Sequence, residues 1–369
     1  MEVKKLTLAN FRNYEQEEIE FSPGTNVIYG DNAQGKTNLL EAVCMFAHGR
    51  SHRAGRDSEL IRFGEKMFRI SLNFSDSTRD YEAVMKVAAN GKKSITINNV
   101  AIKKLSQLMS YLNVVMFSPG ELEIIKGSPS VRRHFMDEAI SQLYPKYISE
   151  LSKYHKALEQ KNVLLKQLRM TGARSDPMLS VWNEQLAQSG ALVELRRRSF
   201  IEKIGATAHS VQEEISKEKL KIDYTPSVDC GIIEGEAAAV FFDKLERAQS
   251  REIEAGASVM GIQRDDVRIR IAEKEAKLFA SQGQQRTAVL SLKLAQTEFI
   301  FEERNEYPVL LLDDIMSELD LGRRQFLSGR IKDKQVLITT TEKEDSQPGT
   351  KYFKISSGRL VEDVSSSGK

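Results

Sequence analysis

Residues 27–40 restrict the fold of this chain more than any other stretch of its sequence. They read V-I-Y-G-D-N-A-Q-G-K-T-N-L-L and contain G-x-x-x-x-G-K-T, the pattern of a phosphate-binding loop. An apolar, β-branched run precedes the loop and a helix-favouring run follows it, so the segment predicts strand, loop and helix in that order. The alternative is a chance glycine turn before a helix, which leaves the lysine, the threonine and both flanks unexplained.

The fixed positions of this loop each have a chemical role. Gly30 and Gly35 let the backbone turn its N–H groups toward a β-phosphate, and the following helix adds its positive N-terminal end. Lys36 is expected to reach the β- and γ-phosphates of ATP, and the Thr37 hydroxyl is expected to bind Mg²⁺. The predicted nucleotide-binding residues of the loop are Gly30, Asp31, Asn32, Ala33, Gln34, Gly35, Lys36, Thr37 and Asn38.

A second segment, residues 307–314, reads Y-P-V-L-L-L-D-D and is an apolar strand that ends in two carboxylates. In a nucleotide-binding α/β sheet such a strand ends beside the phosphate loop, where Asp313 can bind Mg²⁺ together with Thr37. Asp314 then faces the γ-phosphate and polarises the attacking water. Many buried strands end in an acidic residue, so this prediction depends on the loop upstream. The predicted catalytic residues are Lys36, Asp313 and Asp314, and the predicted metal ligands are Thr37 and Asp313.

A third segment, residues 277–286, reads K-L-F-A-S-Q-G-Q-Q-R and opens a long helix. Backbone N–H groups at such a helix start, with the hydroxyl of Ser281 and the nearby Gly283, can bind an anion. The alternative is that Ser281 is only the N-cap of an amphipathic helix. A single phosphate loop has no use for a second anion site, whereas an ATPase that sandwiches nucleotide between two subunits does.

The remaining periodicity predicts the elements that carry these segments. Alternating apolar residues predict a strand hairpin at 68–74 and 81–87, and heptad-like spacing at 144–168 and 179–215 predicts an antiparallel pair of long helices. That pair either projects from or packs on the surface, or forms the core of a helical bundle. Further strands are predicted at 94–97, 113–117 and 336–339, further helices at 129–140 and 236–249, and two strands at 220–224 and 267–271 that return the chain to the α/β body.

Composition limits the classes of protein that need to be considered. The net charge of +2 is too small to indicate nucleic acid binding by itself, so any basic surface has to be local. No run approaches the roughly 20 apolar residues of a membrane helix, and neither a signal peptide nor a membrane partner is expected. Two cysteines without metal spacing fit a reducing compartment, which predicts a cytoplasmic protein. Basic clusters that are either DNA contacts or solvated faces occur at Lys92–Lys93, Lys103–Lys104, Arg132–Arg133 and Arg196–Arg198.

The order of phosphate loop, helical insertion, S-Q-G-Q-Q, L-L-L-D-D and S-E-L-D resembles the ABC-type ATPase heads of the SMC class. Within that class the sequence is similar to the RecF family of bacterial DNA replication and repair proteins, nearly from end to end. The segments that carry this resemblance are N-F-R-N-Y at 10–14, G-D-N-A-Q-G-K-T-N-L-L-E-A at 30–42, G-S-P at 127–129 with Arg132 and Arg133, and D-D-I-M-S-E-L-D at 313–320.

The resemblance implies an α/β fold, namely an ABC-type P-loop ATPase head with mixed sheets and an inserted helical-hairpin lobe. The implied domains are residues 1–125 and 219–363 for the two parts of the head, 126–218 for the helical lobe and 364–369 for a flexible tail. In the implied site, residues 30–37 are Walker A, and Asp313 and Asp314 are Walker B. Ser281 and Gly283 are the signature that contacts ATP on the opposite subunit, and residues 317–320 are the D-loop that crosses the dimer. Arg12 and Arg53 are implied phosphate or base contacts.

For function, the resemblance implies an ATP-dependent DNA-binding protein of recombinational repair and replication-fork maintenance. Two copies would dimerise on ATP at duplex or gapped DNA junctions and help RecO and RecR to load RecA. Hydrolysis would be weak, DNA-stimulated and switch-like. Three departures from the general ABC pattern bear on it: Ser118 stands where a Q-loop glutamine is usual, Asp314 where a glutamate is common, and Thr340–Thr341 where many relatives have a histidine.

Three other function classes stay open at the level of the sequence. A transporter ATPase subunit shares the three motifs, but it needs the Q-loop glutamine and has no long helical pair between them. A phosphate-loop kinase lacks the signature and needs an acceptor site, which the sequence does not show. A nucleotide-dependent structural dimer without DNA binding agrees with the small net charge.

Overall fold

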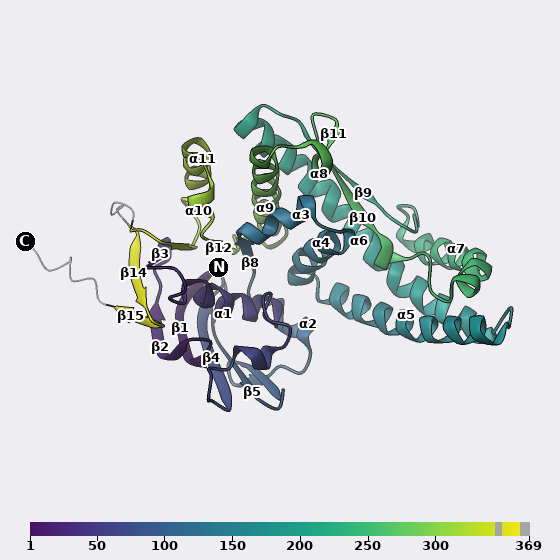
Figure 1. The fold of residues 1–369 in the computed structure, drawn as a ribbon, viewed down its shortest axis with the longest axis horizontal. Helices are drawn as coiled ribbons and strands as arrows, with labels where there is room; N and C mark the ends of the chain where they lie inside the picture. Colours follow the sequence, from purple (N-terminus) through teal and green to yellow (C-terminus); the bar gives the residue numbers. More distant parts are fainter. Residues whose placement is uncertain (344–348, 362–369) are drawn as a thin grey trace, which may run out of the picture. The chain divides into compact units, whose positions relative to one another are not determined.

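The computed structural model describes residues 1–343 and 349–361, and the predicted tail at 364–369 lies outside them. The described chain forms two units (Figure 1). Unit 1 holds residues 1–121 and the chain from residue 296 onward, and unit 2 holds residues 122–295. The phosphate loop and the acidic strand therefore lie in one unit, and the predicted helical hairpin lies in the other.

Alternation of apolar and polar residues builds the first sheet of unit 1, whose strands pair antiparallel in the order β2-β1-β4-β5-β6-β7. The predicted hairpin is confirmed, because β4 and β5 pair from Met67↔Ala88 to Ser75↔Asp80. The strands are β1 (Glu2–Phe11), β2 (Tyr14–Glu20), β4 (Met67–Ser75), β5 (Asp80–Ala88), β6 (Lys93–Ile97) and β7 (Val100–Ala101).

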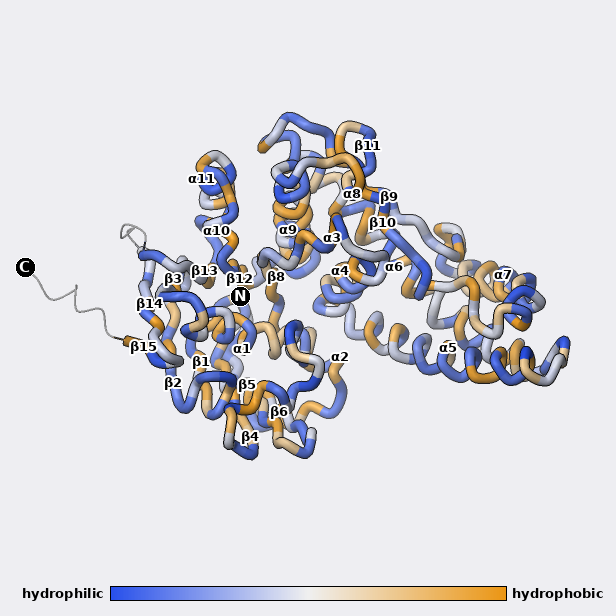
Figure 2. Tube along the Cα trace, in the orientation of Figure 1, coloured by the Kyte–Doolittle hydropathy of each residue, from blue (hydrophilic) through white to orange (hydrophobic). Residues whose placement is uncertain are grey.

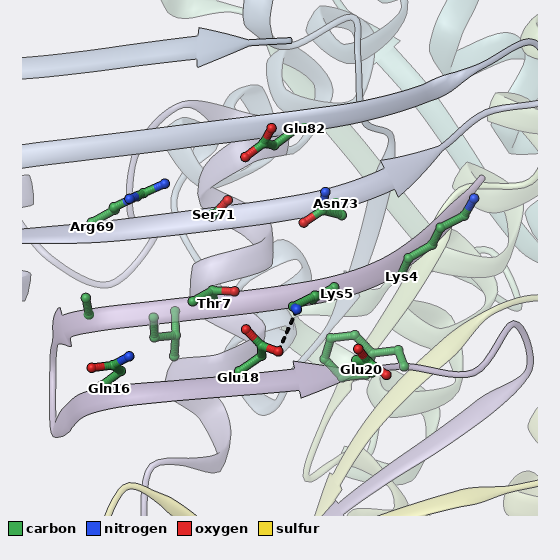
Figure 3. A pocket seen from close by; sticks show the side chains of 13 residues that line it. Lys4, Lys5, Thr7, Gln16, Glu18, Glu20, Arg69, Ser71, Asn73 and Glu82 are labelled. Carbon is green, nitrogen blue, oxygen red and sulfur yellow. Dashed lines mark ion pairs between the residues drawn. The ribbon is translucent and has the colours of Figure 1, made fainter. Parts of the chain in front are cut away.

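One face of this sheet is polar and holds an open groove of about 780 Å³. Figure 3 shows the side chains that line it, with Lys5 paired to Glu18. Basic and acidic side chains balance in this groove, so its charge favours neither an anion nor a cation. The charged lining residues are Lys4, Lys5, Arg69, Glu18, Glu20 and Glu82.

The second sheet of unit 1 is parallel, apart from one edge strand, in the order β15-β14-β3-β13-β12-β8. Because β3, β12 and β13 run in the same direction, their carboxyl ends meet at one edge of the sheet. The phosphate loop after β3 therefore lies next to Asp313. The strands are β3 (Thr25–Tyr29), β8 (Val114–Phe117), β12 (Val309–Asp313), β13 (Val336–Thr340), β14 (Lys351–Ser356) and β15 (Arg359–Val361).

Helix α1 (Lys36–His48) starts at the phosphate loop and packs against both sheets. Leu39, Leu40, Val43 and Phe46 are buried on different sides of it, in a core that also contains apolar residues of β1, β4, β12 and β13. A helix with apolar residues on nearly every side has to be buried between two layers, and this one is. The shorter helices of unit 1 are η1 (Asp57–Leu60), α2 (Leu105–Leu108), α10 (Ile315–Glu318) and α11 (Leu321–Ile331), and η2 (Pro119–Leu122) ends at the boundary of the units.

Unit 2 contains the helical hairpin, α5 (Pro145–Thr171) and α6 (Pro177–Ser216), as the periodicity predicted. Gly172 ends α5 in a left-handed conformation, and Asp176 caps α6 by accepting a hydrogen bond from the Met178 N–H. Helix α7 (Glu234–Ala255) packs against both arms, so the pair is covered on one side. Hydrophobic positions recur along α5, α6 and α7 in Figure 2.

The strands predicted at 220–224 and 267–271 do not join the sheets of the ATPase head. As β9 (Leu220–Thr225) and β10 (Asp266–Ile271) they pair with each other and with β11 (Lys274–Glu275) in a separate sheet of unit 2, because β9 packs against α6. The chain re-enters unit 1 within α9 (Gln282–Arg304). The predicted domains 1–125, 126–218 and 219–363 stay a prediction. The other elements of unit 2 are α3 (Glu123–Lys126), α4 (Pro129–Leu143), η3 (Ile262–Arg264) and α8 (Ala276–Phe279).

In two of the basic clusters one arginine is structural, so these two side chains belong neither to a solvated face nor to an open DNA-binding surface, whereas Arg196 is exposed and its role stays a prediction. Arg197 is 1% exposed and bonds to Asp137 and Asp265, and Arg132 is buried in a two-bonded pair with Asp266. A charged side chain that is buried without a partner destabilises the folded state by several kcal/mol, on the order of 3–5. Buried arginines therefore need acidic partners. The acidic partners lie 60 to 134 residues away in sequence, so local sequence could not show these pairs.

Candidate nucleotide-binding site

The loop between β3 and α1 has a backbone that only glycine can follow at two positions. Gly30 and Gly35 have φ angles of 143° and 111°. A Cβ on Gly30 would lie 2.3 Å from the Ile355 carbonyl oxygen, and one on Gly35 would lie 2.6 Å from Asn13 Nδ2. Asp31, Asn32 and Ala33, at the tip, are exposed. The loop is therefore tightly packed at both ends and open to solvent between them.

Lys36 lies inside the curve of this loop. Its ammonium donates hydrogen bonds to the carbonyl oxygens of Gly30, at 2.6 Å, and Asp31, at 2.8 Å. Burial lowers the pKa of Lys36, and the carboxylates of Asp314, Asp31 and Asp313 oppose this effect. The lysine is thus a held, partly desolvated cation of the kind that binds phosphate oxygens.

Thr37, Asp313 and Thr339 meet at the shared edge of β12 and β13. Asp313 Oδ1 accepts hydrogen bonds from the hydroxyls of Thr37 and Thr339, each at 2.7 Å. Mg²⁺ prefers hard oxygen ligands and is usually bound by one or two protein groups together with phosphate and water. The Thr37 and Asp313 oxygens fit this donor set. No cluster of three or more His, Cys, Asp or Glu that could hold a metal is present in residues 1–343 and 349–361.

Asp314 follows on the same edge in a left-handed conformation, with a φ of 51°. Its N–H donates to Thr339 Oγ1 at 3.0 Å, and its carboxylate accepts from the Ser317 hydroxyl at 3.1 Å. Strand register places Thr340 opposite Tyr29, and Ser118 directly follows Phe117, which is opposite Leu312. Ser118 therefore follows β8, and Thr340 is the last residue of β13, in the same sheet. Thr339, which the sequence analysis did not select, bonds to the Asp313 carboxylate and to the Asp314 N–H.

The N-F-R-N-Y segment supports the loop from the side. Asn13 Nδ2 donates to the Gln34 carbonyl oxygen at 2.8 Å, and the Tyr14 hydroxyl donates to that of Gly35 at 3.0 Å. Asn38 donates to Asn13 Oδ1 at 2.8 Å. The turn between β1 and β2 thus fixes the backbone that is expected to bind phosphate.

A buried carboxylate, Glu41, is the main site residue that sequence reasoning missed. It is 0% exposed and accepts two hydrogen bonds from Arg12, at 2.8 and 2.9 Å, and one from Ser51 at 2.5 Å. Arg53 lies 3.7 Å from the same carboxylate and donates to Asn38 Oδ1 at 3.2 Å. Glu41 therefore holds both candidate arginines one helical turn beyond Thr37. The sequence does contain a sign of this role, because a glutamate within an apolar helix is buried and then needs a cationic or hydrogen-bonding partner.

We expect Glu41→Gln to lower the free energy of unfolding by about 2 kcal/mol, because the amide cannot accept all three hydrogen bonds from these charged and polar donors. Burial raises the pKa of Glu41, but hydrogen bonds from Arg12 and Ser51 outweigh burial and lower it. The stabilisation is therefore complete above the ordinary value of 4.5 and is lost as the pH falls through the lower folded-state pKa.

Urea unfolding at several pH values checks this expectation, with Glu82→Gln, on the exposed face of β5, as the matched control. The two variants should differ at neutral pH and converge in acid. Equal midpoints at neutral pH would contradict the assigned role of Glu41.

The predicted signature residues lie in unit 2 at the start of α9. The Ser281 N–H donates to Gln284 Oε1 at 2.8 Å, and the Gln284 N–H donates to Ser281 Oγ at 3.3 Å. This reciprocal pair is a capping box, so the N-cap alternative describes the contacts that the chain itself makes. Ser281 is exposed, and Gly283 lies in the first turn of α9. Their role toward a second subunit stays a prediction.

Three kinds of comparison with known proteins agree. The family model described as the RecF/RecN/SMC N terminal domain matches residues 2–361. The DNA replication and repair protein RecF of Ruminiclostridium cellulolyticum is 41% identical over 98% of this chain and 99% of its own, and that of Agathobacter rectalis is 41% identical over 92% of both.

A solved structure of the recombination mediator protein RecF with ATP, described in the RecFOR pathway, superposes with a TM-score of 0.90. It is 34% identical and covers 98% of this chain and 97% of its own. The predicted fold class is thereby confirmed. In the part of the chain that the structure describes, no helix is both long and apolar enough to span a bilayer.

Proposed function

The chain belongs to the RecF family of ABC-type ATPase heads, and from this premise we propose that it is an ATP-dependent DNA-binding protein of DNA replication and repair. The observation that carries the proposal is the meeting of Lys36, Thr37, Asp313 and Thr339 at one edge of the parallel sheet. This arrangement provides a phosphate cradle and two oxygen ligands for Mg²⁺, which are what a nucleoside triphosphate needs.

Each group has a definite task in this site. The Lys36 ammonium exchanges its two carbonyl partners for β- and γ-phosphate oxygens, with which it makes stronger, charge-assisted hydrogen bonds. When bound at Thr37 and Asp313, Mg²⁺ supplies positive charge against the phosphate oxygens. Thr339 fixes the Asp313 carboxylate and the Asp314 backbone, and Asp314 accepts a hydrogen bond from the attacking water. Arg12, held by Glu41, adds a further cation beside the helix.

Two copies sandwich ATP in this proposal, with Ser281 and Gly283 of one chain completing the site of the other. Ser281 Oγ and the N–H groups at the start of α9 can bind a γ-phosphate, and residues 317–320 lie at the same sheet edge as Asp313 and Asp314. Hydrolysis is slow and acts as a switch, because Ser118 and Thr340 replace the groups that usually orient water. DNA stimulates it.

The DNA partner is a duplex or gapped junction, and the protein partners are RecR and RecO, through which RecA is loaded on single strands. The support for this step is the family resemblance and the pathway in which the related ATP complex is described.

Sedimentation of the purified chain tests the proposed function. A faster-sedimenting species should form on adding ATP with Mg²⁺, and duplex DNA should co-sediment with it. Failure to bind ATP would refute the nucleotide site. An ATP-dependent dimer that ignores DNA would support the structural-dimer alternative instead.

DNA binding should follow charge rather than base sequence. We expect the logarithm of the affinity to fall linearly with the logarithm of the salt concentration, with a slope of about −0.9 for each phosphate contacted. The slope should be the same for duplexes of equal length and different sequence. Titrations at four salt concentrations with two unrelated duplexes measure both slopes. A strong preference for one duplex at constant salt would contradict the expectation.

A further inference from the structure

Phe63 is the most exposed large apolar side chain of the described residues, with a relative exposure of 103%. It occupies the tip of a four-residue turn in which the Glu65 N–H donates to the Arg62 carbonyl oxygen at 3.0 Å. Gly64, the third residue of the turn, has a φ of 88°, which glycine adopts without strain. The turn is therefore a defined one that holds the ring in solvent.

The chain anchors this turn firmly on both sides. The Arg62 N–H donates to the Asn10 carbonyl oxygen at 2.9 Å, and Asn10 Nδ2 donates to the Glu65 carboxylate at 3.2 Å. Phe11 and Ile61 form a β-bridge. Because the backbone of this turn is already fixed, a ligand that binds at its tip orders little further backbone, which suits a recognition surface.

The same anchor connects Phe63 to the nucleotide site. The Arg12 N–H donates to the Leu60 carbonyl oxygen at 2.7 Å, while the Arg12 side chain bonds to Glu41 on α1. The turn between β1 and β2 thus contacts the phosphate loop through Asn13 and the base of the Phe63 turn through Arg12. Both are therefore linked by hydrogen bonds within unit 1.

Charge around the ring indicates what it binds. Residues 50–66 hold five Lys or Arg and three Asp or Glu. Arg53 and Arg62 lie 3.7 and 3.4 Å from the carboxylates of Glu41 and Glu15, which are outside this segment, and Asp57 lies 2.6 Å from Lys93. Arg50, Arg56 and Lys66 are exposed. A single aromatic ring among cations is not the extended apolar patch that a protein partner covers. It is the combination that binds nucleobases, by stacking on the ring, and their phosphates, by charge.

We propose that Phe63 is a stacking platform for a nucleobase, flanked by cations that bind the attached phosphates. This inference deepens the proposed function and rests on it. The base belongs either to the bound ATP or to an unpaired nucleotide of a nucleic acid, and both present the same flat, aromatic face. The groove of Figure 3 differs from this turn, because its basic and acidic side chains balance and its one aromatic side chain, Phe21, is buried.

Binding of four ligands to the full chain tests the platform. They are ATP, inorganic tripolyphosphate, a single-stranded oligonucleotide and the same oligonucleotide without bases. Phe63→Ala should weaken the binding of either ATP or the normal oligonucleotide by about 5- to 150-fold, the range of one base stacked on an aromatic side chain. Tripolyphosphate and the abasic strand should bind as they do to the parent. Phe63→Trp should restore binding.

The ligand whose affinity falls in Phe63→Ala shows where the stacked base comes from. Weaker binding of ATP assigns the base to the bound nucleotide, and weaker binding of the oligonucleotide assigns it to nucleic acid. Ile232→Ala is the matched control, because Ile232 is 80% exposed but lies between Asp229 and Glu234 in unit 2. The platform is overturned if Phe63→Ala binds all four ligands like the parent, or if the base-free ligands weaken equally. If the parent chain itself binds neither ATP nor DNA, the proposed function is overturned, and the platform that rests on it falls with it.

Discussion

Lys36→Ala is expected to weaken ATP binding by roughly 100-fold or more. The lysine ammonium is the cation inside the phosphate loop, and two charge-assisted hydrogen bonds of about 1.5 kcal/mol each correspond to that factor. The fold should survive, because the partners of this ammonium are two carbonyl oxygens rather than a buried carboxylate. Equilibrium binding of a fluorescent ATP analogue measures the effect.

Lys334→Ala is the matched control for Lys36→Ala. Lys334 is similarly buried in unit 1, but it pairs with Glu298 and lies over the Tyr307 ring, at the start of β13 rather than at its carboxyl end. The control should bind ATP like the parent. Normal ATP binding or ATP-driven dimerisation in Lys36→Ala would refute the assignment of the loop.

Mixing two inactive variants should restore ATP turnover if the site is shared between chains. Ser281→Arg leaves the phosphate loop intact but fills the γ-phosphate position of the partner's site, so alone it should bind ATP and neither dimerise nor hydrolyse. Mixed with Lys36→Ala, it forms a dimer with one fully disabled site and one intact site. Turnover should then reach up to roughly half of the parent's, since neither variant dimerises alone and each mixed dimer has one working site of two.

Asp314→Asn supplies the control for this mixture. It removes the charge that orients water while keeping the side-chain size, so its ATP-bound dimer should persist without turnover. Mixed with Lys36→Ala it should restore nothing, because both substitutions lie on the phosphate-loop side and each of the two sites keeps a defect. Recovery in this mixture would contradict the shared-site mechanism, as would no recovery in the first.

A structural effect of Ser281→Arg has to be measured separately. The substitution also removes the capping box of α9, which is expected to cost about 1 kcal/mol. Ser281→Ala removes the same cap without filling the site. If Ser281→Ala dimerises on ATP and Ser281→Arg does not, the defect lies in the anion position and not in the helix.

The sequence was sufficient for features that depend on neighbours in the chain. The glycines and lysine of the phosphate loop, the carboxylates after β12 and the two long helices all follow from short-range periodicity and backbone conformation. The family resemblance was equally local, since it rested on contiguous motifs. These predictions needed no knowledge of which strand lies beside which.

Pairing between distant segments was decided by the tertiary structure alone. Thr339 is a site residue because parallel pairing of β12 and β13 sets it opposite Asp313, and Glu41 matters because Arg12 and Ser51 converge on it between two sheets. Arg197 resembles a surface cation in sequence but is buried, since Asp137 and Asp265 reach it from other elements. Burial removes a charge from water, so such a residue is stable only where the fold supplies its partner, and that partner is set by topology rather than by sequence neighbours.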